Sequence, residues 1–189
     1  MITTKCKMLL NNEINDSTLT LAEGTELLTL PLNNLKLYSN GHAFRTESIE
    51  RVVINGTFKR FTYAAGLIMH RHNLSAMANW RFELFSDRDQ QGNVLVDTGL
   101  VPVFETKLLQ DLEWGVDDLV SAIGNDWDVR YKPYWFTQQL ALSFRITIED
   151  PNNADGFIDI ARLYMGRVFE PVINFSLGSN VGLGELGKL

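Results

Sequence analysis

Carboxylates and aromatic rings concentrate in one stretch of this sequence, residues 105–138. The acidic side chains there include Glu113, Asp117, Asp118, Asp126 and Asp128, and the rings include Trp114, Trp127, Tyr131, Tyr134 and Trp135. Two carboxylates roughly 5–10 Å apart across a glycosidic bond can hydrolyse that bond. The same mixture can hold a sugar without cleaving it, because aromatic faces pack on its C–H bonds while oxygens accept its hydroxyl protons. A third alternative is a solvated loop whose tryptophans pack against the end of a domain.

Packing is the ordinary role of such rings, and sugar binding is the functional alternative. The candidate carbohydrate-binding residues are Trp114, Trp127, Trp135, Asp117 and Asp118. We assign no catalytic residue, because the sequence has no Gly-x-Ser-x-Gly elbow, no Walker loop and no Gly-x-Gly-x-x-Gly after a strand. We therefore expect a non-enzymatic protein, and a hydrolase using two of these carboxylates stays open as the alternative.

Metal ligands are sparse in the sequence. His70 and His72 lie two apart, on one face of a continuing strand, but no third ligand follows at a suitable spacing. The run from Asp150 to Gly156 has oxygen ligands like a calcium loop, yet its glycine falls at the seventh position, so a hairpin turn is the prediction and calcium stays open. Cys6 stands alone and is expected to be at least half-buried. No metal and no cofactor is predicted.

The length and charge limit the classes of function. The 189 residues, 45% of them hydrophobic, suit one domain that holds a core without disulfides. The net charge of −6 and the absence of a basic stripe argue against nucleic-acid binding. No apolar run approaches the ~20 residues that span a membrane, so no membrane insertion is expected. The first residues lack a signal-peptide pattern, which predicts synthesis in a cytoplasm.

The elements that must position these residues are mostly strands. Period-two alternation predicts strands over residues 18–21, 80–85, 140–149 and 157–165, and β-branched or apolar runs predict strands over 51–58 and 61–69. Gly66 inside the last run indicates a bulge or a close backbone approach. Residues 31–35 predict a helical turn, and 105–138 form the least regular part. The order predicts a mainly β protein, an antiparallel jelly-roll β-sandwich with short helical turns.

The C-terminal segment has a different composition. Residues 176–189 hold four glycines and few anchoring side chains, which predicts an extended arm that orders on assembly. The arm residues are Ser176, Gly178, Gly182 and Gly184. The predicted organisation is an N-terminal region of strands or an arm over 1–27, a jelly-roll domain over 28–175 and the glycine-rich arm over 176–189.

Several segments of the chain share a pattern with a known family. They are Gly66–Leu74, Trp80–Phe85, Val96–Gly99, Asp150–Gly166 with Pro171 and Asn174, and the opening Pro31–Leu35 and Phe44–Thr46. Together they resemble tailed-bacteriophage tail and baseplate proteins that have a discoidin-like (galactose-binding-like) jelly-roll domain. The resemblance extends over roughly residues 28–175, and Phe44 stands where the family often has tryptophan. It implies a structural component of a virion tail tip or baseplate, made in the host cytoplasm.

The resemblance leaves two functions open. In the first, the sandwich and its terminal arms assemble with other tail or baseplate proteins, as identical copies in a symmetric ring. In the second, the protein is a carbohydrate-binding module that contacts glycans of the host surface, with weak affinity per copy multiplied by copy number. Both can hold for one protein.

Overall fold

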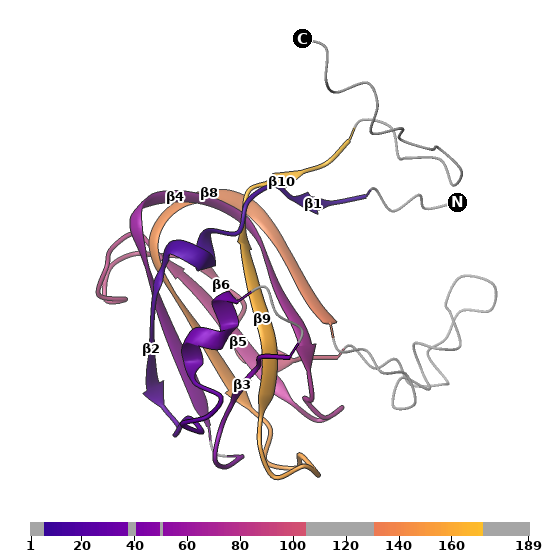
Figure 1. Ribbon diagram of the computed structural model, residues 1–189. Coiled ribbons are helices and arrows are strands. Elements are labelled where there is room, and N and C mark those ends of the chain that lie inside the picture. The colour runs from indigo at the N-terminus through magenta and orange to yellow at the C-terminus, as the bar shows by residue number, and fades with distance from the viewer. Residues whose placement is uncertain (1–5, 38–40, 50, 105–130, 172–189) are drawn as a thin grey trace, which may run out of the picture.

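The computed structural model describes residues 6–37, 41–49, 51–104 and 131–171. Two long strands dominate it, β4 (Val52–His72) and β8 (Tyr131–Glu149), which lie antiparallel and bend together over the top of the molecule (Figure 1). The pairing register of β4 shifts between Thr57 and Thr62 and again between Ala64 and Gly66. Such bulges let one strand pass from one layer of a sandwich to the other.

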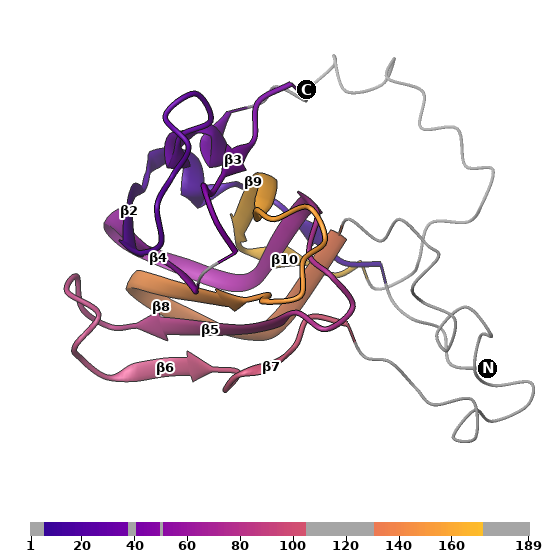
Figure 2. The same cartoon turned by 90° about the horizontal axis from the view of Figure 1, so that it is seen from below.

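The first layer uses one half of each long strand. There β2 (Thr18–Glu23) pairs with residues 53–57 of β4, residues 143–148 of β8 continue the layer, and β5 (Asn79–Phe85) lies beyond β8. Two short strands, β6 (Val94–Asp97) and β7 (Val101–Pro102), pair with β5. Figure 2 shows β4, β8, β5 and β6 lying side by side in this order.

The second layer uses the other halves. Residues 66–72 of β4 pair with β9 (Asp159–Gly166) on one side and with residues 131–135 of β8 on the other. The short β3 (Phe44–Arg45) closes the layer next to β9. Apart from these layers, β1 (Met8–Leu9) pairs with β10 (Val168–Phe169) in a two-stranded ribbon. The architecture confirms the predicted antiparallel jelly-roll sandwich.

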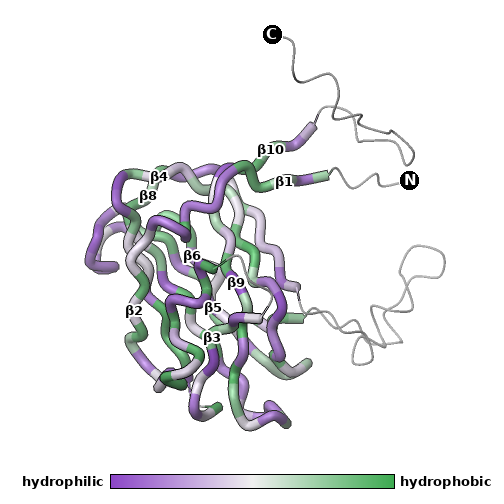
Figure 3. The backbone as a smooth tube through the Cα atoms, viewed as in Figure 1, coloured by the Kyte–Doolittle hydropathy of each residue, from purple (hydrophilic) through white to green (hydrophobic). Residues whose placement is uncertain are grey.

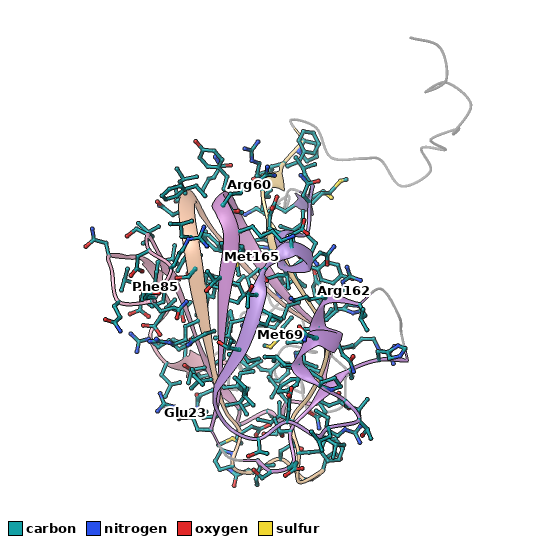
Figure 4. All side chains as sticks on the ribbon, turned by 60° about the vertical axis from the view of Figure 1, so that its left-hand side comes forward. Glu23, Arg60, Met69, Phe85, Arg162 and Met165 are labelled. Atoms are coloured by element: carbon teal, nitrogen blue, oxygen red, sulfur yellow. The ribbon has the colours of Figure 1, made fainter. Side chains whose placement is uncertain are left out.

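The space between the layers is filled by alternate residues of the strands. Trp80, Phe82 and Leu84 of β5 are at most 1% exposed, as the alternation predicted. Met69 of β4 and Met165 of β9 also lie in this interior (Figure 4). The tube in Figure 3 shows the same alternation of apolar and polar residues along β4, β8 and β9. Two short 3-10 helices, η1 (Glu13–Asp16) and η2 (Leu32–Lys36), contribute Ile14 and Leu35 to this core.

Some details differ from the sequence-based expectations. The runs 51–58 and 61–69 form one continuous strand, and Phe61 and Tyr63 in its bend are exposed. Residues 131–138, expected in an irregular stretch, form the first half of β8. Cys6 is exposed. No helix in the described part of the chain is long and apolar enough to cross a membrane.

Candidate functional site

Trp135 lies where the two layers turn into each other. It pairs with Gly66 across β8 and β4, and its indole occupies the space above that glycine. A Cβ atom at position 66 would lie 2.5 Å from Cε3 of the indole and 3.0 Å from Cγ2 of Val168. The glycine therefore lets the ring lie against the backbone of β4, which is the close approach that its place in the strand indicated.

A groove of about 510 Å³ opens beside this indole, and its wall comes from β8, β4 and the segments that include β1 and β10. Its lining residues are Lys7, Ala65, Trp135, Phe136, Thr137, Val168 and Glu170. The ammonium of Lys7 lies 5.9 Å from the centre of the Trp135 ring. A half-buried indole with an ammonium, a hydroxyl and a carboxylate around it offers both an apolar face and hydrogen-bonding groups to a hydroxyl-rich ligand.

Trp135 also belongs to the outer face of the second layer. The register places three rows of side chains on this face: Gly166, Gly66 and Trp135, then Tyr164, Ile68 and Pro133, then Arg162, His70 and Tyr131. The opposite face of the same strands points inward, since Leu67, Met69, Leu163 and Met165 are at most 1% exposed. Trp135 is therefore one end of an outward-facing row on β8 that continues through Pro133 to Tyr131.

Three rings meet at the other end of that face. His70 contacts Tyr131 and Tyr164 edge to face, with ring centres 6.5 Å and 6.1 Å away. The guanidinium of Arg162 lies 4.8 Å from the Tyr164 ring and donates to Asn15 Oδ1 at 3.1 Å. Burial lowers the pKa of His70, and the positive charges of Arg71 and Arg162 lower it further, so the imidazole is neutral near pH 7.

The two histidines of the predicted pair lie in different surroundings. Arg71 between them has a φ of 52°, which takes the backbone out of the extended conformation. His70 is half-buried on the outer face, whereas His72 is 3% exposed, with its ring centre 5.7 Å from that of Phe104. The expectation that both imidazoles share one strand face is wrong for this reason. The described residues contain no group of three or more His, Cys, Asp or Glu side chains that could hold a metal ion.

The turn after β8 is closed by hydrogen bonds. The fully buried carboxylate of Asp150 accepts from the Ser75 backbone N–H at 2.8 Å, the Ser75 hydroxyl at 2.5 Å and the Asn153 amide at 3.0 Å. Gly156 ends the turn with a φ of 76°. The turn is confirmed, but the predicted hairpin is wrong, because among the described strands β8 pairs with β4 and β5 while β9 pairs with β4 and β3, so the turn leads from one layer to the other. The carboxylate oxygens that suggested a calcium loop therefore serve to join this turn to the loop after β4.

The neighbouring loops are cross-linked in a similar way. Asn73 donates to Asp155 Oδ2 and to the Phe157 carbonyl, both at 2.9 Å, and accepts from the Asp159 N–H at 2.7 Å. The guanidinium of Arg45 lies 3.9 Å from the Phe157 ring centre and donates to Asp159 Oδ2 at 2.6 Å. Because these polar groups bind one another, fewer of their hydrogen-bonding atoms are available to a ligand.

Among the predicted carbohydrate-binding residues, the structure therefore places Trp135 in a groove. Trp114, Trp127, Asp117 and Asp118 lie outside the described residues, as do the arm residues Ser176, Gly178, Gly182 and Gly184. The sequence analysis missed Lys7, Thr137 and Glu170. Thr137 lies two positions after Trp135 on β8, so strand alternation could have placed it on the same face. No local pattern marks Lys7 and Glu170, because they meet Trp135 only through the pairing of strands distant in sequence. The aromatic content of β8 and Gly66 in β4 were the signals available.

Comparison with known proteins finds structures of similar fold, but no match by sequence. No protein-family model and no curated protein sequence matches the chain. Among solved structures, a chitosan-binding module of a chitosanase/glucanase from Paenibacillus sp. IK-5 is similar with a TM-score of 0.58 and 8% identity over 83% of this chain and 99% of that one. A Clostridium perfringens carbohydrate-binding module in complex with GalNAc-β-1,3-galactose is similar with a TM-score of 0.55 and 9% identity, over 83% and 100%.

A Ruminococcus gnavus fucosidase in complex with fucose is also similar, with a TM-score of 0.56 and 9% identity over 84% of this chain. The chain spans only 27% of the length of that enzyme. At these identities the likeness shows the fold alone, and this fold agrees with the antiparallel jelly-roll β-sandwich expected from the sequence.

Proposed function

We propose that this protein is a non-catalytic carbohydrate-binding module that holds its glycan in the Trp135 groove. The observation that carries the proposal is the half-exposed indole, seated on Gly66, with Lys7, Thr137 and Glu170 around it. A sugar ring has an apolar C–H face and a rim of hydroxyls. The indole matches the face, and the lysine, threonine and glutamate supply donors and acceptors for the rim.

The similar structures support the same class of ligand. Two of them are described as a chitosan-binding module and a carbohydrate-binding module in complex with a GalNAc-containing disaccharide. One fold hosts many functions, so the groove is the main support for a glycan ligand and the fold adds to it. The part of the chain that the structure describes shows no paired carboxylates in this groove, since Glu170 is the one acidic residue of its lining. A binding role therefore fits the groove better than glycoside hydrolysis, which uses two carboxylates.

A broad glycan array tests the proposal. We expect the full-length protein to bind at least one glycan class, and Trp135→Ala to reduce that binding at least tenfold while the thermal unfolding transition is kept. Trp135→Phe serves as the matched variant, because it keeps an aromatic face and should retain part of the affinity. Absence of binding across the array, or equal binding by wild type and Trp135→Ala, would contradict the proposed site.

Assembly is the second candidate function, and one feature favours it. The ribbon of β1 and β10 lies beside the sandwich (Figure 1) and exposes Met8 and Phe169, which face each other in the pairing register. Leu10, next to the ribbon, is 59% exposed. Exposed apolar side chains that gather in this way commonly mark protein contacts. A role in a phage tail tip or baseplate, with several copies in a ring, remains a proposal based on the sequence resemblance.

Light scattering after size-exclusion chromatography tests assembly. We expect oligomers of the full chain whose population decreases in the double variant Met8→Ser/Phe169→Ser, with unchanged circular dichroism. A monomer at all concentrations would contradict self-assembly. Electron microscopy of purified particles labelled with an antibody against this chain tests the virion proposal. Intact particles that carry no label, and in which mass spectrometry does not detect this chain, would reject it.

A further inference from the structure

The aromatic residues of β8 do not stop at the groove. From Trp135 the outward-facing positions along the strand are Pro133 and Tyr131, and each has an outward partner on β4, namely Gly66, Ile68 and His70 in turn. At about 3.3 Å per residue, the backbone distance from position 135 to position 131 is about 13 Å. That length exceeds one sugar ring and corresponds to a short run of linked rings.

Rings with polar atoms at their edges lie at both ends of this face. Tyr131 is 44% exposed, and His70, Tyr164, Pro133 and Ile68 are each partly exposed, whereas Arg162 is buried. The middle of the face on β4 and β8 is aliphatic, with Ile68 beside Pro133. A polysaccharide can use both kinds of surface, because its C–H faces pack on apolar side chains while its hydroxyls bond to the polar ring edges.

The geometry also keeps the rings in place. His70 stands between Tyr131 and Tyr164 and contacts both edge to face, at interplanar angles of 83° and 87°. Arg162 covers Tyr164 on one side and is itself held by Asn15. Rings fixed by their neighbours lose little conformational freedom on binding, which favours affinity for a ligand that contacts several of them.

We infer that the outer face of the second layer, from Trp135 to Tyr131 and His70, is a continuous binding surface for a linear polysaccharide chain that runs along β8. The inference rests on the proposed function, because Trp135 is the end of the surface at which the groove receives a sugar. It adds that the ligand is an extended polysaccharide chain, whose successive sugars contact successive side chains of this face. A single terminal sugar would contact the groove alone.

The test measures affinity against chain length. The probes are linear β-1,4-glucan, β-1,4-N-acetylglucosamine, β-1,4-mannan and α-1,4-glucan oligosaccharides, each from one sugar to six, titrated into the full-length protein by calorimetry. We expect affinity to rise at least tenfold from one sugar to four in the class that binds. Tyr131→Ala and His70→Ala should each reduce the affinity for the longer oligosaccharides about threefold to tenfold and leave the single sugar unaffected.

Tyr63→Ala is the matched control, because Tyr63 is 42% exposed, close to the 44% of Tyr131, but lies in the bend of β4 outside these rows. It should bind the long oligosaccharides as wild type does. Binding that depends on Trp135 but does not grow with chain length, or that is unchanged in Tyr131→Ala, overturns this inference and leaves the proposed function standing. No binding of any probe, together with a silent glycan array, overturns both.

Discussion

Gly66 and Trp135 are paired residues of β4 and β8, and the indole occupies the space that a side chain at position 66 would take. The clash would involve a ring atom 2.5 Å from the added carbon and a Val168 methyl at 3.0 Å. Since both neighbours belong to packed strands, the ring has to move outward when position 66 carries a side chain.

We expect Gly66→Ala to displace the indole and to weaken glycan binding nearly as much as Trp135→Ala does. It should also lower the free energy of unfolding by about 1–3 kcal/mol, the usual effect of overpacking. Urea denaturation of the two single variants and the double variant measures this. Gly66→Ala should lower the free energy of unfolding less in the Trp135→Ala variant than in the wild type, because the indole is then absent. If the losses of the two single variants add up to the loss of the double variant, the ring and the glycine are not coupled.

The buried His72 makes stability depend on pH. Burial lowers the pKa of His72 to about 4, Lys132 adds to the decrease, and Asp150 opposes it. An unfolded histidine titrates near 6.5. Between these two values the unfolded state binds more protons, so the free energy of unfolding falls as the pH decreases through this window. His72 should therefore lower the free energy of unfolding by about 3 kcal/mol between pH 7 and pH 4.

Chemical denaturation at pH 7, 5.5 and 4 checks the effect, with His72→Asn as the comparison. In the wild type the Leu74 N–H donates a hydrogen bond to His72 Nδ1 at 3.3 Å. The side-chain oxygen of the asparagine can still accept this hydrogen bond. The pH dependence of the variant should be shallower than that of wild type. Parallel curves would assign the acid sensitivity to other groups.

Asp150 should matter far more for stability than Asp155, although both belong to the same turn. Asp150 is 0% exposed and accepts three hydrogen bonds, so Asp150→Ala leaves buried donors without an acceptor. We expect a loss of about 3 kcal/mol in the free energy of unfolding. Asp155 is exposed and accepts one hydrogen bond from Asn73, so Asp155→Ala should change stability by less than about 1 kcal/mol. Similar losses in the two variants would reject this ranking.

Calcium removal tests the alternative use of the same turn. Because the Asp150 oxygens already accept from Ser75 and Asn153, we expect the unfolding temperature to be the same in excess EDTA and in millimolar calcium. Magnesium serves as the control for ionic strength. A rise in unfolding temperature that is specific to calcium would show that a cation binds after all.

The sequence alone determined the strands and the turn that joins two of them. Alternation of Trp80, Phe82 and Leu84 marked a half-buried strand, and the run to Gly156 marked a turn, because these signals depend only on neighbouring residues. The local signal did not show that this turn leads to the other layer and does not close a hairpin. It failed for the start of β8, because residues 131–138 were assigned to the irregular stretch 105–138. Residues 131–135 pair with β4 alone, at an edge of the sheet where proline is tolerated.

The site depended on tertiary structure. Local sequence identified Trp135 as a candidate and Gly66 as a place of close approach, but did not connect them. Pairing register decides which residues face outward, and a slip by one residue would turn Trp135 and Tyr131 toward the core and Tyr134 and Phe136 toward solvent. Thr137 lies beside Trp135 on the same strand, but the meeting of Trp135 with Lys7 and Glu170 needs pairings between distant strands, β4 with β8 and β1 with β10. Such long-range pairing is fixed by burial of the whole core, which no local pattern records.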